Sequence, residues 1–179
     1  MTLAWENKAM TSIVETWFGG SEAAAAITDV LFGEVNPSGK LTMSFPYSVG
    51  QIPVYYNMKN TGRDVYAKDY CRYASNWIDC PNEPLYPFGY GLSYTTFGYS
   101  PITLSDSIIS KNGSVKAKVT VSNTGEYDGY EVVQLYIRDV VSSETRPVKE
   151  LKGFKKIFLK AGESAEVEFD IIPEMLGWY

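Results

Sequence analysis

Residues 115–121 read VKAKVTV, an alternation of apolar side chains with lysine and threonine. Successive side chains of an extended strand point to opposite faces, so this period of two predicts a strand with one buried and one solvated face. The same alternation returns at 131–138 (EVVQLYIR) and at 166–171 (EVEFDI). Turn-forming residues separate these segments, NTG at 123–125 and KAGE at 160–163. The last third of the chain is therefore predicted to consist of short antiparallel strands.

Short strands joined by turns, without a helical period, are typical of an antiparallel β-sandwich of the immunoglobulin-like or fibronectin type III kind. Such a sandwich has about seven strands. The sequence up to Tyr179 supplies only about four or five of them. We therefore expect strands to be missing after Tyr179 and the chain to be cut at both ends.

The N-terminal part has a different pattern. Residues 12–18 (SIVETWF) are rich in β-branched and aromatic types, which predicts a short buried strand. Apolar residues then recur at helical spacing from 23 to 31, and Gly33 is suited to end the helix. Residues 40–45 (KLTMSF) alternate as a second strand. This order predicts a βαβ piece in a parallel or mixed sheet covered by helices.

Between these parts, residues 51–97 show no regular period and are rich in Pro, Gly, Asn and Tyr. Their second half, PLYPFGYGLSYTTF at 84–97, carries too many large apolar groups for a flexible linker. A loop of this length is usually functional or lies over a neighbouring domain. We predict an ordered connector.

Composition excludes several classes of function. A net charge of -5 and a pI near 4.8 argue against a nucleic-acid partner, because phosphate binding needs clustered Lys and Arg. No apolar run approaches the ~20 residues that span a bilayer, and no export signal follows Met1. Histidine is absent, which removes Ser-His and Cys-His nucleophile pairs and most zinc sites. We expect neither a metal nor a cofactor.

The two cysteines, Cys71 and Cys80, lie in the irregular segment. In an oxidising compartment they could form a disulfide, and otherwise they are two thiols. Among the acidic residues, Glu22 is placed to stabilise the start of the predicted helix, where an ionised carboxylate is favoured. Asp69 and Asp79 lie in the long loop, where most acids are merely solvated. None of these carboxyls is predicted to be catalytic.

Five segments resemble, in this order, the C-terminal region of glycoside hydrolase family 3, and specifically its periplasmic β-glucosidase branch. They are 15–57 (ETWFGGSEAAAAITDVLFGEVNPSGKLTMSFPYSVGQIPVYYN), 60–63 (NTGR), 84–97 (PLYPFGYGLSYTTF), 121–139 (VSNTGEYDGYEVVQLYIRD) and 146–164 (RPVKELKGFKKIFLKAGES). The resemblance implies three parts: residues 1–57 from the end of an α/β sandwich domain, a connector at 58–100, and a fibronectin type III-like domain at 101–179 without its last strands. It also implies that an N-terminal barrel domain of the same polypeptide is missing.

The same resemblance implies a retaining, exo-acting β-glucosidase without a cofactor, periplasmic or secreted, acting on β-linked glucosides or oligosaccharides. Retaining glycosidases use two carboxyl groups about 5–5.5 Å apart. In this family one belongs to the first domain and the other usually lies upstream of the matching segments, so no residue of this chain is expected to be catalytic. Two alternatives stay open: a carbohydrate-binding or adhesive module without hydrolytic activity, and specificity for β-xylosides.

Long loops of the second domain border the pocket mouth in this family. Arg63, Tyr73 and Trp77 are therefore candidates for a substrate-binding pocket rim, because Arg offers several donors to sugar hydroxyls and Trp offers a ring face. The alternative is structural: Arg63 pairs with an acid of the missing domain, and Trp77 fills a domain interface.

Overall fold

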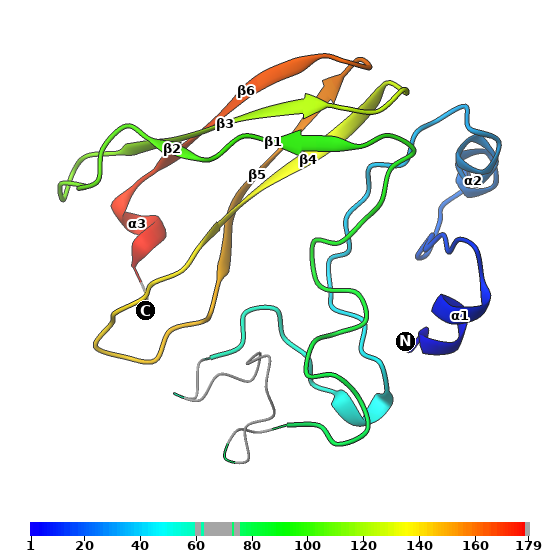
Figure 1. Ribbon diagram of the computed structural model, residues 1–179, viewed down its shortest axis with the longest axis horizontal. Coiled ribbons are helices and arrows are strands. Elements are labelled where there is room, and N and C mark those ends of the chain that lie inside the picture. The colour runs from blue at the N-terminus through cyan, green and yellow to red at the C-terminus, as the bar shows by residue number, and fades with distance from the viewer. Residues whose placement is uncertain (60–61, 63–72, 74–75, 178–179) are drawn as a thin grey trace. The chain divides into compact units, whose positions relative to one another are not determined.

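The computed structural model describes residues 1–59, 62, 73 and 76–177 (Figure 1). The chain divides into two compact units, and each is built from separate stretches of sequence. The first unit comprises Met1–Ala23, Lys40–Tyr90 and Arg138–Glu150, and the second comprises Ala24–Gly39, Gly91–Ile137 and Leu151–Tyr179.

The larger sheet of the second unit is organised around strand β3 (Val115–Asn123). On one side β3 pairs antiparallel with β6 (Ser164–Ile171) over its whole length. On the other side it pairs with two short strands, β1 (Phe97–Tyr99) and β2 (Thr103–Leu104) (Figure 1). Residues 117, 118, 121 and 122 of the central strand thus have a paired neighbour on both sides, which fits its regular alternation.

The second sheet is the ribbon of β4 (Gly129–Ile137) and β5 (Glu150–Leu159). Its inner face packs on the inner face of the larger sheet. The core contains one fully buried side chain from each of four strands: Val121, Val133, Leu159 and Val167, none more than 3% exposed. Burying an aliphatic side chain of this size stabilises a fold by about 1.5–3 kcal/mol. The predicted antiparallel β-sandwich is confirmed, with the apolar positions of the alternating segments facing inward.

Helix α2 (Ala23–Phe32) confirms the helix expected from the apolar spacing. It ends at Gly33, whose φ of 82° is the left-handed conformation that glycine adopts without a steric penalty. The Tyr94 hydroxyl donates a hydrogen bond to the carbonyl of Val30 at 2.6 Å, so a carbonyl in the last turn has a partner.

The turn that follows α2 is held by Asn36. Its side-chain amide donates to the carbonyl of Asp128 at 3.0 Å and accepts from the Ser93 hydroxyl at 2.8 Å and the Tyr94 N–H at 2.9 Å. Gly129 makes the close approach possible, because a Cβ there would lie 2.6 Å from the Asn36 amide nitrogen. The NPSG turn is thereby fixed within the second unit.

The first unit contains helix α1 (Ala4–Ala9) and a short 3-10 helix, η1 (Val49–Gln51), neither of which was predicted. The strand predicted at residues 12–18 is wrong, since these residues form no strand. Trp17 has a φ of 49°, in the left-handed region, and a regular β-strand cannot continue through that conformation.

The second predicted strand of the βαβ piece, residues 40–45, forms only one isolated antiparallel bridge, from Phe45 to Tyr86. Regular pairing stops at this bridge, although Leu41 exchanges backbone hydrogen bonds with Gly89 and Tyr90 further along the two segments. The amide of Phe88 donates to the Ser44 hydroxyl rather than to a backbone carbonyl. The predicted parallel or mixed sheet is therefore absent from residues 1–59, and residues 40–45 instead contact the aromatic connector.

The described chain ends with a single helical turn, α3 (Pro173–Leu176), which was not predicted. Within the described residues, no helix combines the length and the apolar character needed to cross a bilayer.

Candidate functional site

The irregular loop of the first unit is organised by Gln51, which is only 1% exposed. Its carbonyl oxygen accepts the Tyr47 N–H at 2.6 Å, and its amide nitrogen donates to the carbonyl of Pro81 at 2.6 Å and that of Glu83 at 3.4 Å. A buried amide that satisfies both of its ends costs little and fixes the groups it binds. Gln51 therefore fixes the chain around residues 81–83.

Two of the three predicted rim residues lie on this loop surface. Trp77 is 46% exposed and Tyr73 is 70% exposed. The backbone N–H of Trp77 donates to the Asn82 side chain at 3.0 Å, and Asn82 donates to Asn76 at 2.8 Å, so the Trp77 backbone is fixed. Arg63 lies outside the described residues. Both described rings are available at the surface, and the role of the set as a pocket rim stays a prediction.

Next to Trp77, the loop carries a thiol and a carboxylate on consecutive residues. Burial, together with the charge of Asp79 and a hydrogen bond to it, raises the pKa of the Cys80 thiol. A raised pKa keeps the thiol protonated at neutral pH and disfavours nucleophilic chemistry. Cys80 is free in the structure, whereas Cys71 lies outside the described residues, so their pairing stays a prediction.

One carboxyl group among the described residues is buried, that of Glu131 in β4, at 8% exposure. It accepts a hydrogen bond from the Tyr99 hydroxyl at 2.8 Å. Burial, and then this hydrogen bond, raises the pKa of Tyr99, which keeps the phenol protonated as the donor. The pair joins β1 to β4 across the sandwich. We therefore interpret it as a structural contact and not as a catalytic pair.

A polar hollow of about 350 Å³ lies in the first unit. We call it the loop hollow: it is lined by Gly62 and by the segment 138–148 that joins β4 to β5. The Val148 N–H donates to the carbonyl of Met58 at 2.9 Å, and Lys59 pairs with Pro147 in an isolated bridge. One wall of the hollow is thus attached to the chain that precedes Gly62.

Both charge signs line the loop hollow. The Arg146 Nε lies 3.8 Å from a carboxylate oxygen of Asp139, with side-chain exposures of 10% and 33%. The other carboxylate oxygen of Asp139 accepts the Val141 N–H at 3.2 Å. Arg138 and Glu144 also line the hollow. Sequence reasoning missed this site, because its residues show no local pattern and converge only through the contacts with residues 58 and 59.

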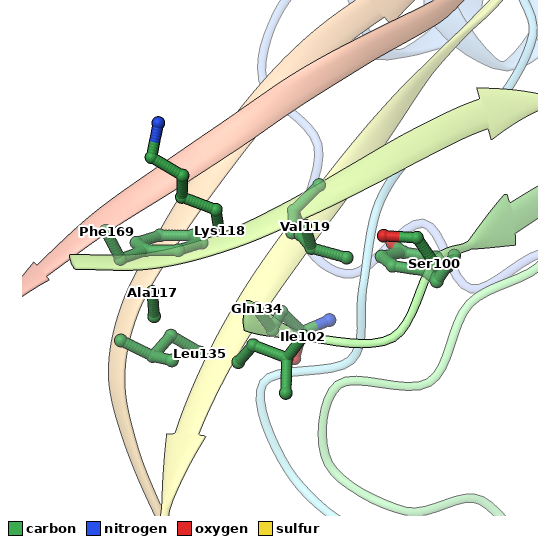
Figure 2. Close-up of a pocket in the computed structure, with 10 residues that line it drawn as sticks. Ser100, Ile102, Ala117, Lys118, Val119, Gln134, Leu135 and Phe169 are labelled. Atoms are coloured by element: carbon green, nitrogen blue, oxygen red, sulfur yellow. The ribbon is translucent and has the colours of Figure 1, made fainter. Parts of the chain in front are cut away.

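A second hollow, of about 250 Å³, lies between the two sheets of the second unit (Figure 2). Its walls are mainly apolar and include Ile102, Val119, Leu135 and Phe169, while the Lys118 amine points away from it. Its polar lining residues include Ser100, Lys118 and Gln134. No cluster of three or more potential metal ligands occurs among the described residues.

Comparison with protein families gives two matches. Residues 1–94 match the glycosyl hydrolase family 3 C-terminal domain, and residues 131–179 match a fibronectin type III-like domain.

Similar proteins of known name are glycosidases. The chain is 52% identical over 179 residues to the periplasmic beta-glucosidase of Salmonella typhimurium, covering 100% of this chain and 23% of that protein. It is 42% identical over 178 residues to thermostable beta-glucosidase B of Acetivibrio thermocellus, covering 99% of this chain and 23% of that protein. A beta-xylosidase of Formosa agariphila is 47% identical over 164 residues, covering 89% of this chain and 21% of that protein. The chain spans about a quarter of the length of these curated relatives.

Among solved structures, the beta-glucosidase of Listeria innocua in complex with laminaribiose superimposes with a TM-score of 0.91 at 43% identity. The match covers 98% of this chain and 24% of that one.

Proposed function

The chain belongs to glycosyl hydrolase family 3, and from this we propose that it is the C-terminal portion of a retaining, exo-acting β-glucosidase. The observation that carries the proposal is the 52% identity to a periplasmic beta-glucosidase along the whole chain. The superposition on the beta-glucosidase of Listeria innocua, with a TM-score of 0.91, is a second comparison that supports the proposal. Partners of this portion are then the remaining domains of its polypeptide, and substrates are β-linked glucosides or oligosaccharides.

In this proposal the chain provides the frame of the enzyme and the two catalytic carboxylates lie elsewhere in the polypeptide. Retaining hydrolysis needs a nucleophile and an acid/base about 5–5.5 Å apart. Glu131, the one buried carboxyl among the described residues, is engaged by Tyr99 and by further contacts. It faces no second buried carboxyl within that part of the chain. We therefore place no catalytic role on this chain.

The same proposal gives the surface of the irregular loop a role at the pocket rim. Tyr73 and Trp77 expose ring faces of the kind that stack on sugar rings. The hydrogen-bonded backbone of Trp77 supports it, because a backbone that is already ordered loses less freedom on binding. Arg63 is proposed as the third member for its hydrogen-bond donors. By the same relationship to a periplasmic relative, we propose a periplasmic or secreted location.

Hydrolysis of an aryl β-glucoside tests the proposal. The full-length protein that contains this chain is expected to release the aryl alcohol and to retain the anomeric configuration in the first-formed sugar. The 179-residue chain alone is expected to be inactive, and Asp79→Asn is expected to leave the full-length rate unchanged. Turnover by the chain alone that disappears in Asp79→Asn would refute the assignment of the chemistry to other domains.

Specificity for β-xylosides is the second candidate, and the Formosa agariphila beta-xylosidase at 47% identity favours it. The ratio of kcat/KM for aryl β-glucoside to that for aryl β-xyloside decides between the two. A carbohydrate-binding or adhesive module is a third reading, favoured by the exposed Tyr73 and Trp77. It predicts glycan binding by the chain together with no hydrolysis by the full-length protein.

A further inference from the structure

The loop hollow has the size of a ligand site, and one of its walls is attached to another segment of the chain. Its volume of about 350 Å³ falls within the range of about 300–1,000 Å³ that is usual for small-molecule sites. Its far wall is attached to residues 58 and 59 by a backbone hydrogen bond and a β-bridge. Near its start, Asp139 holds the Val141 N–H at 3.2 Å and lies near Arg146. The contacts with residues 58 and 59 thus attach the end of the loop, and those of Asp139 order its start from within the loop.

The lining selects for a neutral ligand. Among the lining residues that the structure describes, Arg138 and Arg146 contribute two positive charges and Asp139 and Glu144 contribute two negative charges, so these four ionised groups sum to zero. A phosphate or sulfate would meet the two carboxylates, and a metal ion would meet the two guanidinium groups. Either would be opposed by charges of its own sign.

The hydrogen-bonding groups in the lining narrow the class of ligand further. Guanidinium groups only donate, carboxylates only accept, and the hydroxyls of Ser142, Ser143 and Thr145 do both. A sugar ring presents neighbouring hydroxyls that each donate and accept, and it can satisfy both kinds of group at once. No aromatic side chain lines the hollow among the described residues, so a flat aryl or nucleobase ligand has no ring to stack on.

We propose that the loop hollow is a binding site for a neutral pyranose sugar. The sugar class rests on the lining alone, whereas the choice of a β-glucoside rests on the proposed function. In this site Asp139 and Glu144 accept hydrogen bonds from sugar hydroxyls, and Arg138 donates to a hydroxyl or ring oxygen. Arg146, 10% exposed in its side chain, orients Asp139.

Photolabelling of the full-length protein tests the site. A β-glucoside that carries an alkyl diazirine is irradiated with the protein, and labelled tryptic peptides are mapped by mass spectrometry. Trypsin does not cleave between Arg146 and Pro147, so residues 139–149 are released as one peptide. That peptide is expected to be labelled, and excess methyl β-glucoside is expected to compete whereas sodium sulfate is not.

Two variants locate the site. Asp139→Asn is expected to reduce labelling of the 139–149 peptide about tenfold, the loss of one hydrogen bond to a charged group. Glu144→Gln, at an exposed position, is expected to act in the same direction and gives a second reading if Asp139→Asn destabilises the loop. Glu126→Gln, an exposed acid of the second unit, is the matched control and is expected to leave labelling unchanged.

The proposal is overturned if the 139–149 peptide stays unlabelled, if sulfate competes as well as the glucoside, or if neither variant reduces labelling. Hydrolysis is measured separately on the same protein. Hydrolysis of β-glucosides without labelling of this peptide would refute the proposed sugar site alone. Labelling of the peptide without hydrolysis would refute the proposed function alone.

Discussion

Asn123, at the end of β3, uses both ends of its side-chain amide while being only 1% exposed. Its oxygen accepts from the Thr95 hydroxyl at 2.6 Å and from the Gly125 N–H at 3.2 Å. Its nitrogen donates to the carbonyls of Tyr127 at 2.8 Å and Leu159 at 3.1 Å. One residue thus joins the segment before β1, the turn before β4 and the end of β5. The sequence marks it only as a turn residue of NTG, because its partners are far away in the chain.

The substitution Asn123→Asp should test this assignment with little change in shape. The new carboxylate oxygen would face the two carbonyls of Tyr127 and Leu159, which removes two hydrogen bonds and buries a charge. We expect a loss of about 3 kcal/mol in the free energy of unfolding, measured by urea denaturation. Ser122→Ala, which removes an exposed hydroxyl contact with Ser164, is the control and should stay within about 0.5 kcal/mol. Equal losses in the two variants would contradict the role given to Asn123.

At the scale of elements, a ladder of charges covers the outer face where β3 and β6 pair. Lys116 bridges Glu168 and Asp170, and Lys118 bridges Glu166 at 2.8 Å and Glu168 at 3.0 Å. Hydrogen bonds from Lys116 and then Lys118 lower the pKa of Glu168. Hydrogen bonds to Glu166 and Glu168 raise the pKa of Lys118 to about 12. The ladder holds the two strands in register by cross-strand pairs.

Its contribution to stability has a defined pH window. The folded pKa of Glu168 lies below the ordinary value of 4.5, so its stabilisation is complete above pH 4.5 and is lost as the pH falls through the folded value. For Lys118 the stabilisation is complete below pH 10.5 and is lost as the pH rises towards about 12. Glu168→Gln should lower Tm at pH 7, and the deficit should vanish in acid and shrink at high salt. Glu126→Gln is the control; a deficit that persists at pH 2 would contradict the ladder.

The joint between the turn after α2 and the start of β4 gives an element-scale prediction. In Gly129→Ala the new Cβ would lie 2.6 Å from the Asn36 amide nitrogen and 3.3 Å from a Thr95 methyl group. Asn36 must then leave its partners, and we expect a loss of about 1–3 kcal/mol in urea denaturation. In an Asn36→Ala background the clash is removed, so the cost should fall and the two losses should not add. Gly39→Ala, with nothing within 4 Å, is the control.

Prediction from the sequence succeeded where an element is defined by its own residues. The segments 115–121, 131–138 and 166–171 alternate because each lies between a core and solvent, and all three became strands. It failed at 12–18, where β-branched composition could not reveal the left-handed φ of Trp17. The strands β1 and β2 were missed because two or three residues carry no measurable period.

At the scale of the whole molecule, the two units share the chain in an interleaved order. The segment Arg138–Glu150 belongs to the first unit, but it leaves β4 at one end and enters β5 at the other. The loop hollow is built on this segment, which explains why the sequence alone could not predict it. The residue pattern of the sequence predicts neither the attachment of Pro147 and Val148 to residues 58 and 59 nor the proximity of Asp139 and Arg146.

From the interleaved order we predict that the structure of residues 138–150 in the first unit depends on the second unit more than the strands of the second unit depend on the first. Loss of structure in the second unit releases both ends of the 138–150 segment, whereas loss of the irregular loop around Gln51 releases neither strand. Hydrogen exchange measured by mass spectrometry on the full chain should show it. Asn123→Asp should accelerate exchange about a hundredfold in β3 and β6, from its loss of about 3 kcal/mol, and should also accelerate exchange in residues 139–149.

In Gln51→Glu a carboxylate would face the carbonyls of Pro81 and Glu83, and exchange should accelerate around residues 81–83, whereas the Tyr47 N–H keeps a side-chain oxygen as its acceptor. The strands of the second unit should keep their protection. Glu83→Gln makes the reverse change at an exposed position of the same loop and should leave exchange unchanged. If Asn123→Asp leaves residues 139–149 as protected as in the unmodified chain, the loop hollow is held by the first unit alone and the dependence argued from the interleaved order is wrong.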